Sequence, residues 1–189
     1  MHFLQQCYWG DLMKVFFDKQ LYSDITKLSL YDAKENIMLI GAKRNGDSLE
    51  TDPKTFKWFC PEELKAQTED NAIVSEKTMV KNVSNIISKG YNSVIMIHTH
   101  PCKTDIEDWL FASLSEEDLN AAKNVELICE LQGARFFAGV STCNGVYFWM
   151  LDPKSYKPIQ LDCYIDGVNV TKKVPTTLQE IVVKLQNTK

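Results

Sequence analysis

The stretch SVIMIHTHP, residues 93–101, decides how the rest of the chain is interpreted. Its first five residues predict a buried β-strand. His98 and His100 follow at positions i and i+2, which face the same side of a strand. Pro101 has no amide hydrogen and therefore ends the strand pairing. The pattern predicts two imidazoles that emerge together at a strand end. Two such groups supply half of a tetrahedral zinc site, although surface histidines without a ligand share the same H-x-H spacing.

The elements around this strand are predicted from apolar spacing, capping residues and turns. Helices are expected at 1–22, 75–89 and 115–124 and from Thr177 onward. Strands are expected at 26–31, 37–41, 93–97, 125–131, 135–142 and 146–151, with a further hairpin at 160–170. Residues 52–71 carry little pattern and are expected to be irregular or partly helical. This order predicts a mixed α+β fold in which helices pack on a sheet.

The composition is that of a globular domain with a substantial core. Of 189 residues, 44% are hydrophobic and 24% are charged, and no repeat or linker interrupts the chain. We expect one domain over 1–189, with its core at about 26–151, an N-terminal helix at 1–25, and a C-terminal hairpin and helix at 152–189.

Charge and hydropathy argue against two classes of partner. Lys and Arg total 21 and Asp and Glu total 25, which gives a net charge of −4. The chain therefore lacks the excess of basic residues that is typical of a nucleic-acid-binding surface. No apolar run approaches the roughly 18 residues that a membrane span requires. The first residues lack a basic leader and include Asp11, which does not favour a secretory signal. We expect neither nucleic-acid nor membrane partners.

The cysteines form no C-x-x-C pair, and several lie in apolar stretches where a thiol packs like a small hydrophobic group. We therefore interpret them as reduced rather than as a disulfide framework, which predicts a cytoplasmic protein. The six are Cys7, Cys60, Cys102, Cys129, Cys143 and Cys163.

A second motif, Ser115-x-x-Asp118, opens the helix after the histidines. By itself it is explained by helix capping, with Ser115 at the cap and Asp118 in the first turn. Combined with His98 and His100, it offers a third metal ligand and a hydroxyl group beside the metal. Three protein ligands plus an open position are typical of a catalytic zinc site.

The combination of H-x-H-P and S-x-x-D resembles the metal motif of the JAB/JAMM (MPN-domain) metalloisopeptidases. This resemblance covers about residues 26–151. It implies a Zn²⁺ ion held by His98, His100 and Asp118, with water in the fourth position. It also implies a single MPN/JAB-like α+β domain, in which a mixed curved sheet carries packed helices in a cytidine-deaminase-like layering.

The resemblance further implies a glutamate general base and a serine that binds the oxyanion. Glu35, directly before the strand predicted at 37–41, is our choice for the base, and Glu50 is the reserve. An exposed turn carboxylate beside Lys34 is the alternative interpretation of Glu35. Ser115 would donate the hydrogen bond to the oxyanion.

One departure from the family pattern concerns spacing. The family has about six residues between the proline and the serine, whereas this chain has 13, at 102–114. We interpret the difference as an insertion, which leaves Asp105 or Asp108 as alternative third ligands. Trp109 and Phe111 in this insert are candidates for substrate binding, and packing onto the core is the equal alternative.

These observations predict a zinc-dependent hydrolase that cleaves an amide or isopeptide bond, with a protein or peptide substrate such as a ubiquitin-like tail. An extended tail would be held in a groove or by strand addition. Two other functions stay open: an inactive interaction or scaffold module, and a bacterial toxin-, defence- or peptidoglycan-related hydrolase of other specificity on the same metal site.

Overall fold

The computed structural model describes residues 13–68, 71–102 and 112–175. The helices are α1 (Lys19–Tyr31), α2 (Glu76–Ser88) and α3 (Glu116–Glu130), with two short 3₁₀ turns, η1 (Pro53–Thr55) and η2 (Pro61–Glu63). The strands are β1 (Lys14–Phe16), β2 (Ile37–Asn45), β3 (Ser48–Thr51), β4 (Lys57–Trp58), β5 (Leu64–Gln67), β6 (Ala72–Val74), β7 (Ser93–Thr99), β8 (Arg135–Thr142), β9 (Gly145–Leu151), β10 (Pro158–Ile165) and β11 (Val168–Asn169).

The main sheet closes on itself, which corrects the fold class expected from the sequence. Strand β1 pairs in parallel with both β3 and β10, so seven strands form a closed mixed barrel in the order β1-β3-β2-β7-β8-β9-β10. The expected layered MPN/JAB-like α+β domain with an open curved sheet is therefore wrong. The closing strand lies at 14–16, a segment that apolar spacing had assigned to an N-terminal helix. Because this segment is expected to be helical, the sequence does not predict that the barrel closes.

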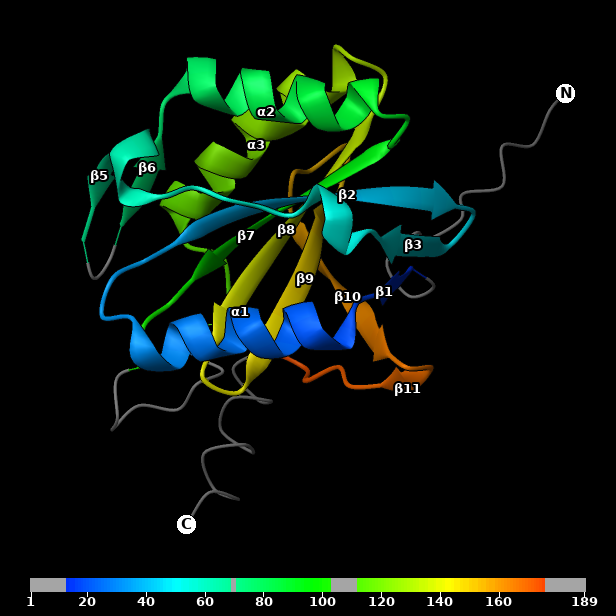
Figure 1. The fold of residues 1–189 in the computed structure, drawn as a ribbon. Coiled ribbons are helices and arrows are strands. Elements are labelled where there is room, and N and C mark those ends of the chain that lie inside the picture. Colours follow the sequence, from blue (N-terminus) through cyan, green and yellow to red (C-terminus); the bar gives the residue numbers. More distant parts are fainter. Residues whose placement is uncertain (1–12, 69–70, 103–111, 176–189) are drawn as a thin grey trace, which may run out of the picture.

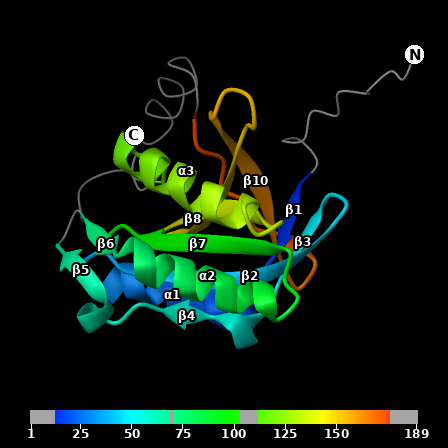
Figure 2. The ribbon, with the colours of Figure 1, turned by 90° about the horizontal axis from the view of Figure 1, so that it is seen from above.

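The three described helices lie on two sides of the barrel wall (Figure 1). Helices α2 and α3 lie on one side and α1 lies on the other. Seen from above, α2 and α3 flank β7 (Figure 2). In the described ranges, no helix is both long enough and apolar enough to cross a membrane.

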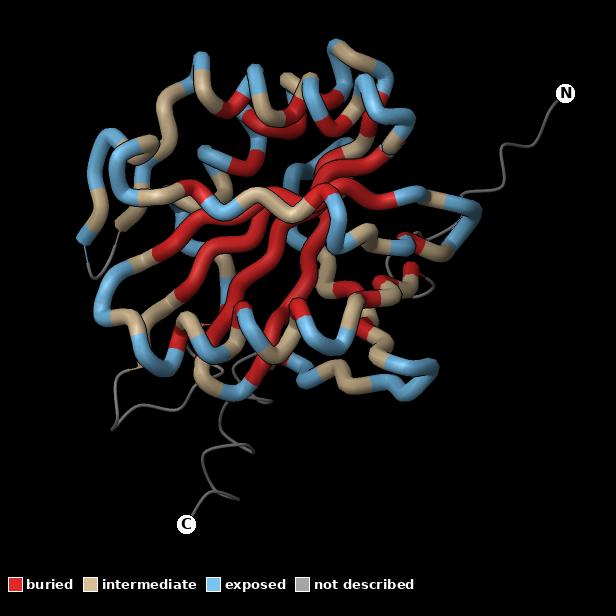
Figure 3. Tube along the Cα trace, in the orientation of Figure 1, coloured by how far each residue is buried: buried red, intermediate tan, exposed pale blue. Residues whose placement is uncertain are grey.

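The central strands are largely buried (Figure 3), and their side chains divide the core into two clusters. One set of buried side chains, including Met38, Ile95 and Ile97, packs with α1. The opposite set, including Leu39 and Met96, packs under α2 and α3. Because successive strand residues point to opposite faces, each central strand of the barrel contributes to both clusters. This leaves β7 buried along its whole length.

Two predicted strands are helical in the structure. Residues 26–31 belong to α1, in which Leu21, Ile25 and Ser29 are buried at spacings of four. Residues 125–130 belong to α3 and Leu131 is its C-cap; Ala122, Val125 and Cys129 are buried in this helix at helical spacing. Both segments are apolar enough for a strand, but the buried positions follow a period of 3.6 rather than 2.

The remaining central elements agree with the sequence prediction. Helix α2 begins after its capping residue Ser75 and ends before Gly90, whose φ of 88° suits glycine. Strands β7, β8 and β9 and the hairpin β10–β11 also lie where they were expected. The region at 52–71 contains η1, β4, η2 and β5. The last helix, predicted from Thr177, falls outside the described residues.

Two valines of α2 test the packing under this helix. Val83 is fully buried, whereas Val80 is 37% exposed on the same helix. Val83→Ala removes two buried methyl groups, so we expect it to lower the free energy of unfolding by about 2 kcal/mol. Val80→Ala has the same change in helix propensity and is expected to cost less than about 0.5 kcal/mol. Urea denaturation measures both, and equal losses would contradict the assigned burial.

Candidate metal centre

Strand β7 delivers the two histidines together, as the i, i+2 spacing predicts. The Nε2 atoms of His98 and His100 lie 3.0 Å apart, and their ring centroids are 4.8 Å apart. His98 pairs with Ile37 of β2 and with Val140 of β8, so its backbone is fixed from both sides. The amide of His100 donates to the carbonyl of Ser141 at 2.8 Å. Both rings are therefore held by the barrel wall.

Helix α3 brings Asp118 to the same point. Its Oδ1 lies 3.4 Å from Nε2 of His98. Its Oδ2 accepts from the backbone amide of Ser115 at 2.8 Å and from the Ser115 hydroxyl at 2.7 Å, while the Asp118 amide donates to that hydroxyl oxygen. This reciprocal arrangement is a capping box. One carboxylate oxygen thus holds the helix end, and the other faces the histidines.

The surroundings of Asp118 favour its ionised form. Burial acts to raise the pKa of this carboxyl, but the hydrogen bond and charge of His98, together with the bonds from Ser115, hold the pKa well below its usual range. An ionised carboxylate is the form that binds a metal.

Glu35 also reaches this cluster. Its Oε1 lies 3.7 Å from Nε2 of His100, and its side chain is 12% exposed. The backbone amide of Glu35 donates to the carbonyl of Thr68, and its carbonyl accepts from the Gln67 side chain at 2.8 Å. This placement differs from an exposed turn carboxylate. Glu35 instead faces the histidines from the segment that precedes β2.

A pair of buried residues connects that segment to β7. The amide of Asn36 donates to the hydroxyl of Thr99, and the amide of Thr99 donates to the carbonyl of Asn36, each at 2.9 Å. The Oδ1 of Asn36 accepts from the indole of Trp58. Both Asn36 and Thr99 are fully buried. This pair of hydrogen bonds was not predicted, because its sequence signal is a single threonine between the two histidines.

The donor set could hold a metal ion. One ligand atom from each of His98, His100 and Asp118 lies within 4.8 Å of the others. In a tetrahedral site with zinc–nitrogen bonds of about 2 Å, two ligand atoms lie roughly 3.3 Å from each other. The Nε2–Nε2 distance of 3.0 Å and the Nε2–Oδ1 distance of 3.4 Å are close to that value. The chain therefore has a site that could hold a metal ion, and the donor set alone does not identify which one.

A groove of about 1030 Å³ leads away from these donors. Its walls come from β6, α2 and α3, and it includes Glu35, both histidines, Ser115 and Asp118. Apolar side chains farther along it include Val80, Leu127 and Leu131, which are 37%, 56% and 79% exposed. These groove residues were not predicted from the sequence. The groove places an apolar surface beside the polar cluster.

The other predicted site residues have different outcomes. Glu50 is exposed on β3 and pairs with Lys43, at the end of β2 opposite the histidines. It is therefore not part of the cluster. Trp109 and Phe111, and the alternative ligands Asp105 and Asp108, lie outside the described residues.

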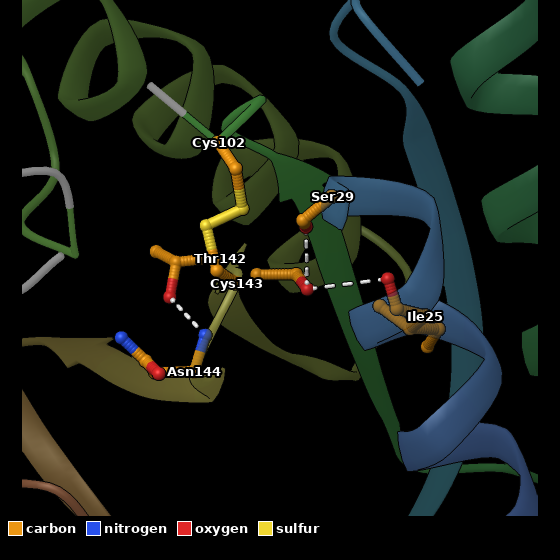
Figure 4. The surroundings of a disulfide bond; sticks show 7 residues. Ile25, Ser29, Cys102, Thr142, Cys143 and Asn144 are labelled. Carbon is orange, nitrogen blue, oxygen red and sulfur yellow. Dashed lines mark hydrogen bonds between the residues drawn. A yellow bond between two sulfur atoms is a disulfide. The ribbon is translucent and has the colours of Figure 1, made fainter. Parts of the chain in front are cut away.

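A disulfide lies next to the candidate ligands (Figure 4). Cys102, two residues after His100, is bonded to Cys143 in the turn between β8 and β9, with the Cα atoms 5.6 Å apart. The expectation that all six cysteines are reduced is wrong for this pair. Their sequence separation of 41 residues gave no signal, because only the fold brings the β8–β9 turn beside the end of β7.

Comparison with known proteins adds no identification: no family model matches the chain, and no curated protein matches it. The case for a functional site therefore rests on the geometry of the cluster.

Metal binding is the first test of this site. We expect the full chain, supplied with zinc and desalted, to retain about one ion per chain. His98→Ala removes a donor and should abolish this retention. His2→Ala removes the only histidine outside the motif and should leave it unchanged. Elemental analysis measures all three proteins. Zinc retained by the His98 variant would show that the ion binds elsewhere.

The two tasks of the capping box can be separated by substitution. Ser115→Ala removes the cap but no ligand, so it should lower the free energy of unfolding by about 1 kcal/mol and leave the metal content unchanged. Asp118→Ala removes both cap and ligand, and should lose the metal as well as stability. Urea denaturation without metal, paired with elemental analysis, distinguishes the two variants. Full metal content in the Asp118 variant would remove this residue from the ligand set.

Proposed function

We propose that the protein is a zinc-dependent hydrolase that cleaves an amide or isopeptide bond. The observation that carries the proposal is the convergence of His98, His100 and Asp118, with Glu35 beside them, at one end of a large groove. A bound zinc ion supplies Lewis acidity and lowers the pKa of water toward 7. Two imidazoles and one carboxylate are the kind of donor set that leaves a position open for this chemistry.

Glu35 would act as the general base. Its carboxylate lies 3.7 Å from Nε2 of His100, and Glu35 lines the same groove as the candidate ligands. From there it can accept a proton from the attacking water and return it to the leaving amine. Its backbone amide donates to the carbonyl of Thr68 and its backbone carbonyl accepts from the Gln67 side chain, and these two bonds hold its backbone in this position.

Ser115 would bind the developing oxyanion. It lines the groove, but its single hydroxyl hydrogen is donated to Oδ2 of Asp118 in the structure. Donation to an oxyanion requires this hydrogen to turn away from Asp118. The backbone amide of Ser115 would continue to hold Oδ2 and so keep Asp118 in place.

The substrate would be a protein or peptide with an extended tail, and a ubiquitin-like tail is the class we favour. Strand β6 lines the groove and pairs only with β5 in the described part of the chain. An extended peptide could add to its other edge, so that main-chain hydrogen bonds direct the scissile bond toward the metal. The apolar residues Val80, Leu127 and Leu131 would receive side chains of the tail.

The resemblance to JAB/JAMM enzymes supports this chemistry through its motif residues, while the fold expected with it was wrong. The proposal therefore depends on the donor set rather than on family membership. A cytoplasmic location also stays a prediction. The disulfide between Cys102 and Cys143 weighs against its premise of reduced cysteines, since such bonds persist mainly in oxidising compartments.

The activity test compares two glutamates. Zinc-loaded protein is assayed on isopeptide-linked ubiquitin-like conjugates and on short peptides. Glu35→Gln keeps the size of the side chain but removes the base, so kcat/KM should fall by about 100-fold or more while zinc content stays constant. Glu50→Gln makes the same change far from the cluster and should stay within about twofold of the unmodified protein.

Full activity of the Glu35 variant would remove this residue from the mechanism. A zinc-loaded protein that cleaves neither substrate class would contradict the proposed hydrolase and favour a binding module. Cleavage of short peptides alone would leave the hydrolase in place and exclude the ubiquitin-like specificity.

A further inference from the structure

The disulfide fixes the chain where it leaves the candidate metal centre. Cys102 follows His100 by two residues, and its partner Cys143 directly follows β8. In the described part of the chain, Cys102 has two attachments: this bond and a hydrogen bond from its amide to the carbonyl of Ser29. Of these two described attachments, opening the disulfide would leave the hydrogen bond.

The neighbouring contacts transmit that constraint to His100. The Ser29 hydroxyl donates to the Ser141 hydroxyl, which in turn donates to the carbonyl of Ile25 (Figure 4). The carbonyl of Ser141 accepts from the amide of His100. The C-terminal part of α1, the end of β8 and the segment after β7 are thus connected around one ligand. The disulfide is the covalent member of this set.

The pair differs from two of the three described free cysteines in its accessibility. Cys102 and Cys143 are both partly exposed. Exchange with an external thiol requires access to one of their two sulfur atoms. Cys129 and Cys163 are buried, and burial raises the pKa of each thiol to about 12. Because the thiolate is the reactive form, these two are poor partners for exchange.

The remaining described thiol is also poorly reactive. The sulfur of Cys60 donates a hydrogen bond to the carboxylate of Glu63, and this bond raises the thiol's pKa. In the described ranges, the accessible redox chemistry is therefore concentrated at the disulfide beside His100.

We propose that the Cys102–Cys143 disulfide is a redox switch on the metal centre, closed in the metal-competent form and opened by a dithiol reductant. One thiolate of the reductant attacks a sulfur of the pair to form a mixed disulfide, which the second thiol of the reductant then displaces. Cys102 and Cys143 each gain one electron and one proton. The dithiol loses two electrons and two protons and becomes a disulfide.

Opening the pair weakens metal binding because His100 loses support for the backbone that follows it. Groups that orient metal ligands typically change metal affinity by about 10- to 100-fold, so we expect about tenfold weaker zinc binding after reduction. This inference rests on the proposed metal site. Its test measures zinc affinity and does not require hydrolase activity.

The test uses the full chain in two redox forms. Dithiothreitol opens the pair and is removed under anaerobic conditions, and thiol labelling with mass spectrometry verifies opening. Zinc affinity is then measured by competition with a chromophoric chelator. The reduced protein should bind about tenfold more weakly than the oxidised protein. A variant carrying both Cys102→Ser and Cys143→Ser should match the reduced protein and not respond to dithiothreitol. Cys60→Ser, a matched change outside the pair, should keep the full response.

Three outcomes would overturn the switch. Equal or tighter zinc binding after verified opening would show that the bond does not support the centre, while the metal site itself would stand. A pair that resists dithiothreitol until the protein unfolds would be a structural crosslink only. If neither redox form binds zinc, the proposed function fails first and the switch fails with it.

Discussion

The register between β2 and β7 is the constraint on which both the core and the candidate site depend. Ile37 lies opposite His98, and the pair of hydrogen bonds between Asn36 and Thr99 continues the pairing by one step. A slip of one residue would turn every side chain of β7 to the other face of the sheet. His98 would then enter the cluster that packs with α1, and Ile97 would face the groove. The buried apolar residues on both faces of β7 make such a slip costly, so the packing of the core also orients the histidines.

The site combines groups with different structural supports. His98 lies on strand β7 of the barrel wall and His100 directly follows that strand, whereas Asp118 lies in the first turn of helix α3, which packs against the wall. The capping box orients the short side chain of Asp118 at the start of helix α3. Because one oxygen of Asp118 is occupied by the amide and hydroxyl of Ser115, the other is directed at His98. Capping and ligation are compatible uses of one carboxylate, so the capping interpretation never excluded the metal.

The sequence predicted the histidines and Asp118 because their signals are local. An i, i+2 pair on a strand and an S-x-x-D at a helix start follow from backbone geometry. Barrel closure was not predictable in this way, since β1 has three residues and takes its place through pairing with β3 and β10. The partners of Cys102 and Glu35 likewise depend on contacts between distant segments. Residues 26–31 and 125–131 were misassigned because apolar residues that are close in sequence satisfy either period over so short a window.

A bound ion would also change how the parts of this fold depend on one another. Its protein ligands come from the end of β7 and the start of α3, elements that otherwise meet through apolar packing under the helix. An ion that binds only the folded arrangement stabilises that arrangement in proportion to the logarithm of its free concentration over its dissociation constant. The metal would therefore act as a crosslink between helix and barrel. Because the groove is lined by α3 together with α2 and β6, anything that alters how firmly Asp118 holds the ion also alters how firmly one groove wall is held against the barrel.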